Sequence, residues 1–173
     1  AADFGHGAMS PAVVETVCSN GAFLAINTQA NAGNRGFNTV LKYPRMDYAC
    51  MAEHELRLAA RDGSSSVRPL LEDLRSQSGA RTMLVTRGRW GCEVHSANGE
   101  YVKSPSFAMN VLDRIGAGDA LFAVTSLAVR LGADEELVGL VGNAVGGLAV
   151  EIIGNESFVD RMRLKKYLFS LLK

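Results

Sequence analysis

Three short apolar runs constrain the fold of this chain more than any other feature. They cover residues 22–26 and 48–51 and the centre of the stretch 81–86, and each of these stretches is long enough for one strand. Continuous apolar runs, in contrast to alternating ones, are typical of strands in a parallel sheet that helices cover on both faces. Segments with the apolar spacing of helices separate these runs, and strands that alternate with helices favour the α/β class. The sequence therefore predicts a three-layer α/β chain with a mostly parallel sheet in the middle layer.

The remaining local patterns predict one hairpin and a series of helices. Residues 92–95 and 100–102 alternate in polarity around Ala97-Asn98-Gly99, which is a hairpin pattern. In the helix expected over 120–131, an apolar stripe that includes Leu127 and Leu131 should face the core. We expect the other helices over residues 11–19, 53–61, 67–74, 135–153 and 158–172.

The helix expected over 135–153 has an unusual content of glycine. Its core stripe should include Leu137, but its interior also holds Gly139, Gly142, Gly146 and Gly147. Each interior glycine costs a helix about 1 kcal/mol relative to alanine. Something must therefore approach this helix closely, and we expect a neighbouring helix in preference to a flat ligand.

Charge and cysteine content exclude several classes of function. The chain has 173 residues, with 18 Lys+Arg and 18 Asp+Glu. This zero net charge argues against nucleic acid or an anionic membrane as a partner, and no apolar run is long enough to cross a bilayer. Cys18, Cys50 and Cys92 lack the spacing of a metal site. We therefore expect reduced core thiols in a cytoplasmic protein without a secretory leader.

Residues 111–121 predict a glycine turn that leads directly into a helix. Gly116 and Gly118 let the backbone approach a ligand because they have no β-carbon. The amides from Gly116 to Asp119 lie at the expected helix start, where they have no acceptor within the helix. Such amides, with the positive end of the helix dipole, form an anion site. Asp119 then either caps the helix or acts on a bound group.

The motif Asp113-Arg114-Ile115-Gly116-Ala117-Gly118-Asp119 resembles the C-terminal signature of the ribokinase-like, or PfkB, family of carbohydrate kinases. The resemblance implies that the amides of Gly116, Ala117 and Gly118 form the anion hole for the transferred phosphoryl group. It also implies that Asp119 is the base that takes the proton from the acceptor hydroxyl, with Asp113 as a candidate substrate-binding residue. The family usually has Thr in place of Arg114. A dinucleotide fingerprint is a poor alternative, because its third glycine would fall on Leu121.

A second point of resemblance lies where the strand over 48–51 meets the helix over 53–61. The family has Asn-x-x-Glu here, which helps to place Mg²⁺ and phosphates, and this chain has Ala52-Glu53-His54-Glu55. Glu55 is therefore the implied Mg²⁺ residue; without the family it is a solvated acid near a helix dipole. Ala52 cannot supply the amide. Either Glu53 or the Asn-rich loop after the first strand substitutes for it, or nucleotide handling is weakened.

The resemblance also implies a set of residues that line the nucleotide. Thr86, Gly88 and Gly91 match a Val-Thr-x-Gly-x-x-Gly segment beside the phosphates and ribose, although Gly-x-x-Gly between strands also predicts a simple turn. Asn143 matches an Asn-Ala segment beside the adenine. Asn27 follows a strand at the end where α/β sheets bind ligands, so it is a further candidate for contacts with the nucleotide or sugar. The asparagines that follow it are equally explained as turn residues.

The extent of the resemblance predicts what part of a kinase the chain represents. Residues 3–7 and 27–31 are similar to a branch of the family related to heptose-phosphate kinases, with His6 where that branch has Lys. The resemblance covers nearly all of this chain but only the later half of such a kinase. We therefore expect residues 1–173 to form the C-terminal, nucleotide-handling portion of a PfkB-type domain. Such a portion should be inactive alone and should associate with the missing half or with a second copy.

The implied activity is ATP-dependent transfer of a phosphoryl group to a hydroxyl of a sugar or sugar phosphate. ATP and Mg²⁺ are the implied cofactors, with a monovalent cation as a further candidate. Two alternatives stay open. One is a degenerate homologue that binds a nucleotide or metabolite without turnover, which Ala52 and Arg114 favour. The other is a domain whose main role is assembly within a multi-domain protein.

Overall fold

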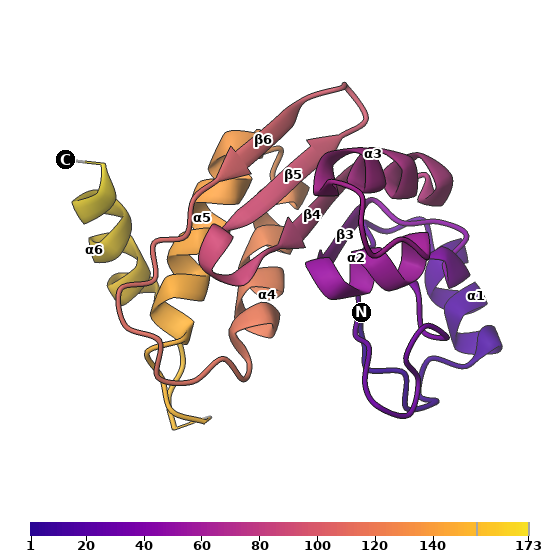
Figure 1. Cartoon of the computed structure of the whole chain (residues 1–173), viewed down its shortest axis with the longest axis horizontal. Helices are drawn as coiled ribbons and strands as arrows, with labels where there is room; N and C mark the ends of the chain where they lie inside the picture. The colour runs from indigo at the N-terminus through magenta and orange to yellow at the C-terminus, as the bar shows by residue number, and fades with distance from the viewer. Residues whose placement is uncertain (155, 173) are drawn as a thin grey trace.

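The structure, a computed structural model, describes residues 1–154 and 156–172 (Figure 1). Within these residues, six strands lie side by side in one sheet in their order along the chain. The first four run parallel, and the last three form an antiparallel meander. This sheet confirms the predicted α/β class and the predicted hairpin. The strands are β1 (Ala2–Asp3), β2 (Ala25–Thr28), β3 (Tyr48–Ala52), β4 (Thr82–Thr86), β5 (Cys92–Ser96) and β6 (Tyr101–Ser104).

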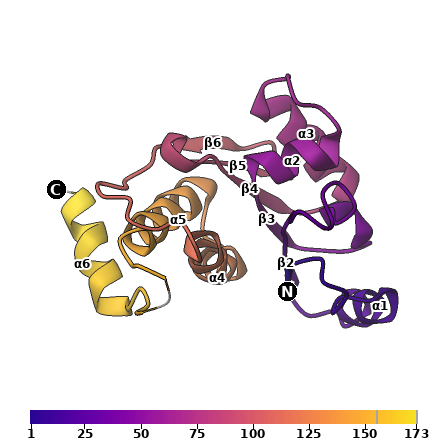
Figure 2. The ribbon, with the colours of Figure 1, turned by 60° about the horizontal axis from the view of Figure 1, so that its bottom comes forward.

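Helices cover both faces of the sheet, as Figure 2 shows. One face carries α1 (Pro11–Ser19), α2 (Glu53–Ala60) and α3 (Val67–Ser78). The other face carries α4 (Ala117–Arg130) and α5 (Glu135–Ala149), and α6 (Arg161–Leu171) packs on α5. Two short 3₁₀ turns, η1 (Val40–Lys42) and η2 (Gly88–Trp90), lie in the connections. The arrangement confirms the three predicted layers.

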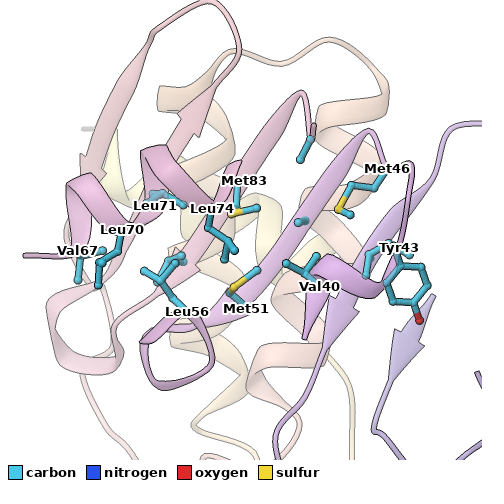
Figure 3. Packing of buried hydrophobic residues seen from close by; sticks show 14 of the residues in the cluster. Val40, Tyr43, Met46, Met51, Leu56, Val67, Leu70, Leu71, Leu74 and Met83 are labelled. Atoms are coloured by element: carbon cyan, nitrogen blue, oxygen red, sulfur yellow. The ribbon is translucent and has the colours of Figure 1, made fainter. Parts of the chain in front are cut away.

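The larger core lies between the sheet and the layer that contains α2 and α3 (Figure 3). Met51 and Met83, from the adjacent strands β3 and β4, point into this core, and Leu56 of α2 and Leu74 of α3 cover them. Burying one such side chain fully contributes about 1.5–3 kcal/mol. The packing of Leu56 therefore fixes α2, and with it the polar first turn of that helix, against the end of β3.

Tyr48 fixes α4 against the opposite face of the sheet. Its hydroxyl donates a hydrogen bond of 2.8 Å to Oγ1 of Thr125, and its ring stacks on Phe122. The predicted core stripe of this helix is only partly correct, because Leu121 is buried whereas Leu127 and Leu131 are 65 % and 86 % exposed. Thr125 is a polar residue and is therefore not expected in the core. The hydrogen bond from Tyr48 satisfies its hydroxyl group, so Thr125 is fully buried. The buried face of α4 is therefore rotated away from its most apolar stripe.

The glycines of α5 permit close packing, as predicted. A β-carbon at Gly139 would lie 2.8 Å from Cβ of Ser104 on β6, and one at Gly142 would lie 3.0 Å from Cγ2 of Thr125 on α4. Gly146 is less crowded, because its β-carbon would lie 3.7 Å from Cδ1 of Leu121. α5 therefore approaches both α4 and the sheet more closely than a helix of larger residues could.

The bounds of the last two helices differ from those predicted. α5 ends at Ala149, and the carbonyl of Val150 accepts hydrogen bonds from the amides of Leu112 and Asp113, so the chain leaves the helix there. Leu137, expected in the core, is 45 % exposed because smaller neighbours in the helix face the sheet. α6 begins later than predicted, with Asp160 as its N-cap.

Two further expectations from the sequence concern the state of the cysteines and the lack of an apolar run that could cross a bilayer. All three cysteines are buried and free, as expected of core thiols. No helix in the described part of the chain is both long enough and apolar enough to cross a membrane.

Candidate active site

The carboxyl ends of the parallel strands meet at one edge of the sheet. β2 ends at Thr28 and β3 at Ala52, which pairs with Thr86 at the end of β4. α2 begins at this edge, and a hydrogen bond between Gln29 and Asp119 brings the start of α4 to the same place. Open α/β sheets bind their ligands at this edge.

Two hydrogen-bonded amide side chains hold Asp119 in place. Nδ2 of Asn27, which is buried at the end of β2, donates to the carbonyl of Cys50 at 2.8 Å. Nε2 of Gln29 donates to Oδ1 of Asn27 at 3.0 Å and to Oδ1 of Asp119 at 2.7 Å. Within the described residues the second oxygen of the exposed Asp119 has no partner. Gln29 therefore orients one oxygen of Asp119 and leaves the other free for a bound group.

Gln29 is a site residue that the sequence analysis did not single out. The available signal was its spacing, because Gln29 follows Asn27 by two positions. In an extended chain, residues two positions apart point to the same face. A polar pair at the carboxyl end of an apolar run therefore indicated two side chains directed to one site.

The first turn of α4 presents free amides beside Asp119. Gly116, the N-cap, has φ of 77°, a value that glycine adopts without steric cost. In the described part of the chain, the amides of Gly118 and Asp119 have no acceptor, whereas the amide of Ala117 bonds to the carbonyl of Arg114 at 3.4 Å. A β-carbon at Gly118 would meet nothing within 4 Å. The fold therefore does not require glycine at 118, and its missing side chain leaves the amides accessible to an anion.

Glu55 links the first turn of α2 to the loop after β2. Its Oε2 accepts the amide of Ala52 at 2.7 Å, and its Oε1 accepts the amide of Ala30 at 2.8 Å. Ala30 follows Gln29 directly, so two consecutive residues contact Glu55 and Asp119. The structure thus brings the two acidic residues of the predicted site to a common backbone segment.

Cys50 lies beneath this arrangement. Burial raises the pKa of its thiol, and the carboxylates of Glu55 and Asp119 raise that pKa further by smaller amounts. The thiol is therefore protonated at neutral pH.

Asp113 fastens the glycine turn to the end of α5. Its Oδ1 accepts the amide of Ile115 at 2.9 Å, and its Oδ2 accepts the amide of Gly154 at 2.8 Å. These backbone hydrogen bonds lower the pKa of Asp113, that from Ile115 most of all. Both oxygens of this predicted substrate-binding residue therefore hold the turn in position.

Thr86, Gly88 and Gly91 form the turn between β4 and β5. Gly88 and Gly91 have φ of 56° and 84°, and a β-carbon at Gly91 would collide with the carbonyl of Ser104. The turn by itself therefore requires glycine at 91 and favours it at 88. Asn143 of α5 reaches the same carbonyl, because its Nδ2 donates to Ser104 at 2.9 Å. Gly91 and Asn143, predicted to line one nucleotide, thus converge on one residue.

Arg87 connects this turn to the start of α2. Its Nε donates to Oε2 of Glu53 at 2.8 Å, and its Nη1 donates to Oε1 of the buried Glu93 at 2.6 Å. Glu53 also accepts two hydrogen bonds from Arg57. Glu53 is therefore part of an ion-pair network, which weakens the hypothesis that it replaces the amide missing at Ala52.

The asparagines of the loop after β2 serve mainly as turn residues. Asn31 and Asn34 both donate to the carbonyl of Phe4, and Asn38 donates to the carbonyl of Asp3. These contacts hold the loop against the residues that follow β1. Of the asparagines in this region, Asn27 is the one that points toward Asp119, through Gln29.

The residues present suit a magnesium ion that arrives with a nucleotide. No group of three or more His, Cys, Asp or Glu side chains in the described ranges could hold a metal by itself. Mg²⁺ keeps several waters and is usually bound through one or two carboxylates together with substrate phosphates. Glu55 retains lone pairs after accepting two amides. It could therefore contact a hydrated ion held mainly by phosphates.

Comparison with known proteins gives consistent matches. Residues 12–160 match the family model described as "pfkB family carbohydrate kinase". The bifunctional protein HldE of Geotalea uraniireducens is 27 % identical over 160 residues, which cover 90 % of this chain and 32 % of that protein. The chain thus spans about a third of the length of this curated relative.

Solved structures share the fold. E. coli ribokinase II in complex with ATP and Mg²⁺ aligns with a TM-score of 0.75 and 23 % identity, over 91 % of this chain and 52 % of that one. E. coli phosphofructokinase-2 in complex with potassium aligns with a TM-score of 0.78 and 14 % identity, over 94 % and 52 %. The sheet, its helical layers and the family match agree, so this chain belongs to the pfkB family of carbohydrate kinases.

Proposed function

We propose that this chain is the phosphoryl-transfer portion of an ATP-dependent carbohydrate kinase that acts on a hydroxyl of a sugar or sugar phosphate. One observation carries the proposal. The exposed carboxylate of Asp119 is oriented by Gln29 directly beside two free amides at the start of a helix of 14 residues. A base and an anion site must lie this close together if one accepts a proton while the other holds the transferred group.

Each residue of this arrangement has a distinct role in the proposed reaction. The free oxygen of Asp119 takes the proton of the acceptor hydroxyl as its oxygen attacks the γ-phosphorus of ATP, and ADP leaves. The amides of Gly118 and Asp119 donate to the oxygens of the transferred phosphoryl group, where charge is concentrated. Gln29 keeps Asp119 in the required rotamer. Gly116 and Asp113 set the geometry of the turn.

The cofactors would bind at the same edge of the sheet. Mg²⁺ bound to the ATP phosphates would neutralise their charge, and Glu55 would contact that ion through water. Thr86, Gly88, Gly91 and Asn143 would line the nucleotide, with Asn27 supporting Gln29. A monovalent cation is a further candidate cofactor, because the related phosphofructokinase-2 binds potassium.

A second candidate function is binding of a nucleotide without turnover. The observation that favours it is Ala52, which caps α2 without a side-chain hydrogen bond where the family has an amide. Occupied oxygens on Glu55 also reduce its capacity to hold a metal. A measurement of turnover by the protein that carries this chain distinguishes the kinase from a protein that only binds nucleotide.

The test uses two variants in the kinase that carries this chain, assayed for ADP release over a panel of sugars and sugar phosphates. Asp119→Asn should lower turnover by roughly a hundred- to ten-thousand-fold and leave ATP binding intact. Gly118→Ala should preserve the fold, because its β-carbon enters open space, yet lower turnover by crowding the phosphoryl group.

Asp134→Asn is the matched control, because Asp134 caps α5 and Asn is an equally good cap. It should leave turnover unchanged. Near-normal turnover of Asp119→Asn would refute the assignment of the base. Turnover absent from the wild type over the whole panel, with ATP still bound, would favour the second candidate.

A further inference from the structure

An open groove of about 660 Å³ lies between the loop after β2 and the outer side of α2. Its volume is within the range of about 300–1,000 Å³ that is typical of sites for small molecules. Four of the residues that line it carry basic side chains: Arg35, His54, Arg57 and Arg61. We call this feature the basic groove. It is separate from the helix start that carries Asp119.

Glu53 already pairs with Arg57, so the excess positive charge of the basic groove comes from its other two arginines. The one acid in its lining is Asp62, whose oxygens accept hydrogen bonds from the hydroxyls and amides of Ser64 and Ser65. Among the described residues, neither Arg35 nor Arg61 takes part in an ion pair. The chain as a whole has 18 basic and 18 acidic residues, so this concentration of positive charge is local.

Hydrogen bonds hold the side chain of Arg57 in place in the lining of the basic groove. Glu53 accepts two of its N–H groups, at 3.0 and 2.7 Å, and the carbonyl of Ser65 accepts a third at 2.9 Å. A guanidinium carries five N–H donors, so Arg57 retains donors for a further acceptor. A fixed guanidinium loses little conformational entropy when it binds an anion.

Arg61, which also lines the groove, adopts an unfavourable backbone conformation. Its φ of 54° and ψ of 34° are left-handed, and no other non-glycine residue in the described part of the chain has a positive φ. This position closes α2, where glycine is the common choice because it has no β-carbon. Strain of this kind is often retained at ligand sites. The long cationic side chain is thus kept where glycine would suit the fold better.

We propose that the basic groove is an anion site that binds the phosphate group of a small metabolite. Guanidinium groups match phosphate oxygens through paired N–H donors, and the groove offers them from both of its walls. Arg35 lies on the loop that continues from Ala30, and Ala30 is bonded to Glu55. A phosphate that bridges Arg35 and Arg61 therefore also restrains the loop that carries Gln29.

The experiment follows binding to the isotope-labelled chain by NMR. Inorganic phosphate, ribose 5-phosphate and ATP are titrated separately, and their comparison tells whether the phosphate comes from the free ion, a sugar phosphate or a nucleotide. The amides around Arg35 and Arg61 should shift with at least one of these probes. Shifts confined to the amides around Gly118 with all three probes would overturn the proposal.

The variant Arg61→Gly distinguishes a loss of phosphate binding from a loss of folding. This variant removes the guanidinium and relieves the backbone strain, so its unfolding temperature should rise while phosphate binding weakens on the order of tenfold. Arg35→Ala should weaken binding similarly. Arg81→Ala, which removes an exposed arginine outside the groove, is the control and should bind as the wild type does. Unchanged affinity in Arg61→Gly and Arg35→Ala would exclude the site.

Discussion

Glu53 and Arg87 join two parts of the candidate site through one ion pair. The pair links the first turn of α2, where Glu55 lies, to the turn that contains Gly88 and Gly91. Arg87 also neutralises Glu93, whose side chain is 3 % exposed. A buried carboxylate without a partner is strongly destabilising, and Arg87 shares this partnership of Glu93 with Tyr101 and Lys103.

Acid should weaken this pair and destabilise the protein. Hydrogen bonding from Arg87, first of all, lowers the pKa of Glu53. A carboxyl with a pKa lower in the folded state contributes stability above its unfolded pKa of about 4.3, and that stability is lost as pH falls through the folded pKa. Glu53→Gln should therefore show a smaller loss of unfolding free energy than the wild type between neutral pH and the acid range.

The measurement is urea unfolding at a series of pH values, with Glu15→Gln as the control. Glu15 is exposed on α1 and takes part in no ion pair within the described residues. Its variant should keep the acid sensitivity of the wild type. If Glu53→Gln keeps that sensitivity as well, the ion pair with Arg87 makes no net contribution to stability.

At the scale of elements, the glycines of α5 determine how closely the α4–α5 layer packs. Gly139 faces β6 and Gly142 faces α4, so one helix meets two neighbours at short distance. The packing of α4 in turn fixes the position of its first turn, where Asp119 lies. The geometry of the candidate site thus depends on residues that never contact a ligand.

Two alanine substitutions in the same helix should have opposite effects. Gly139→Ala introduces a β-carbon 2.8 Å from that of Ser104 and should destabilise the protein by about 1–3 kcal/mol. Gly146→Ala makes an ordinary contact of 3.7 Å with Leu121 and should stabilise it by up to about 1 kcal/mol, through helix propensity. Urea unfolding of both variants is the test. Equal shifts of the same sign would mean that packing does not explain the glycines.

The whole molecule leaves apolar side chains exposed where α4 meets α5. Leu127 on α4 and Leu131 directly after it are 65 % and 86 % exposed, and Leu137 on α5 is 45 % exposed. Exposed apolar patches of this kind mark surfaces that associate.

We expect this chain to associate in a concentration-dependent way through these leucines. Leu131→Lys should shift the equilibrium toward the monomer, because a charge would be buried in the contact. Sedimentation velocity at several concentrations measures the effect, and Phe169→Lys on α6 is the control for an exposed apolar residue elsewhere. A chain that stays monomeric at all concentrations, or one equally affected by both variants, would contradict this prediction.

The sequence by itself determined the class of the fold and the position of the glycine turn. Apolar runs, caps and glycines act through neighbours a few residues away, so the strands, the hairpin and the start of α4 beside Asp119 could be predicted. Family membership follows from the same local motif and is confirmed by the match over residues 12–160. The roles of the individual site residues stay predictions.

Tertiary structure alone decided which side chains meet. Gln29 and Asp119 are separated by 90 positions, and Asn143 and Ser104 by 39. Such partners depend on strand register and on how helices pack on the sheet, which the whole core sets together. The same reason explains the error in the α4 stripe, since Tyr48 made burial of Thr125 possible. Local pattern fixes where a residue lies along an element, whereas packing fixes what that residue faces.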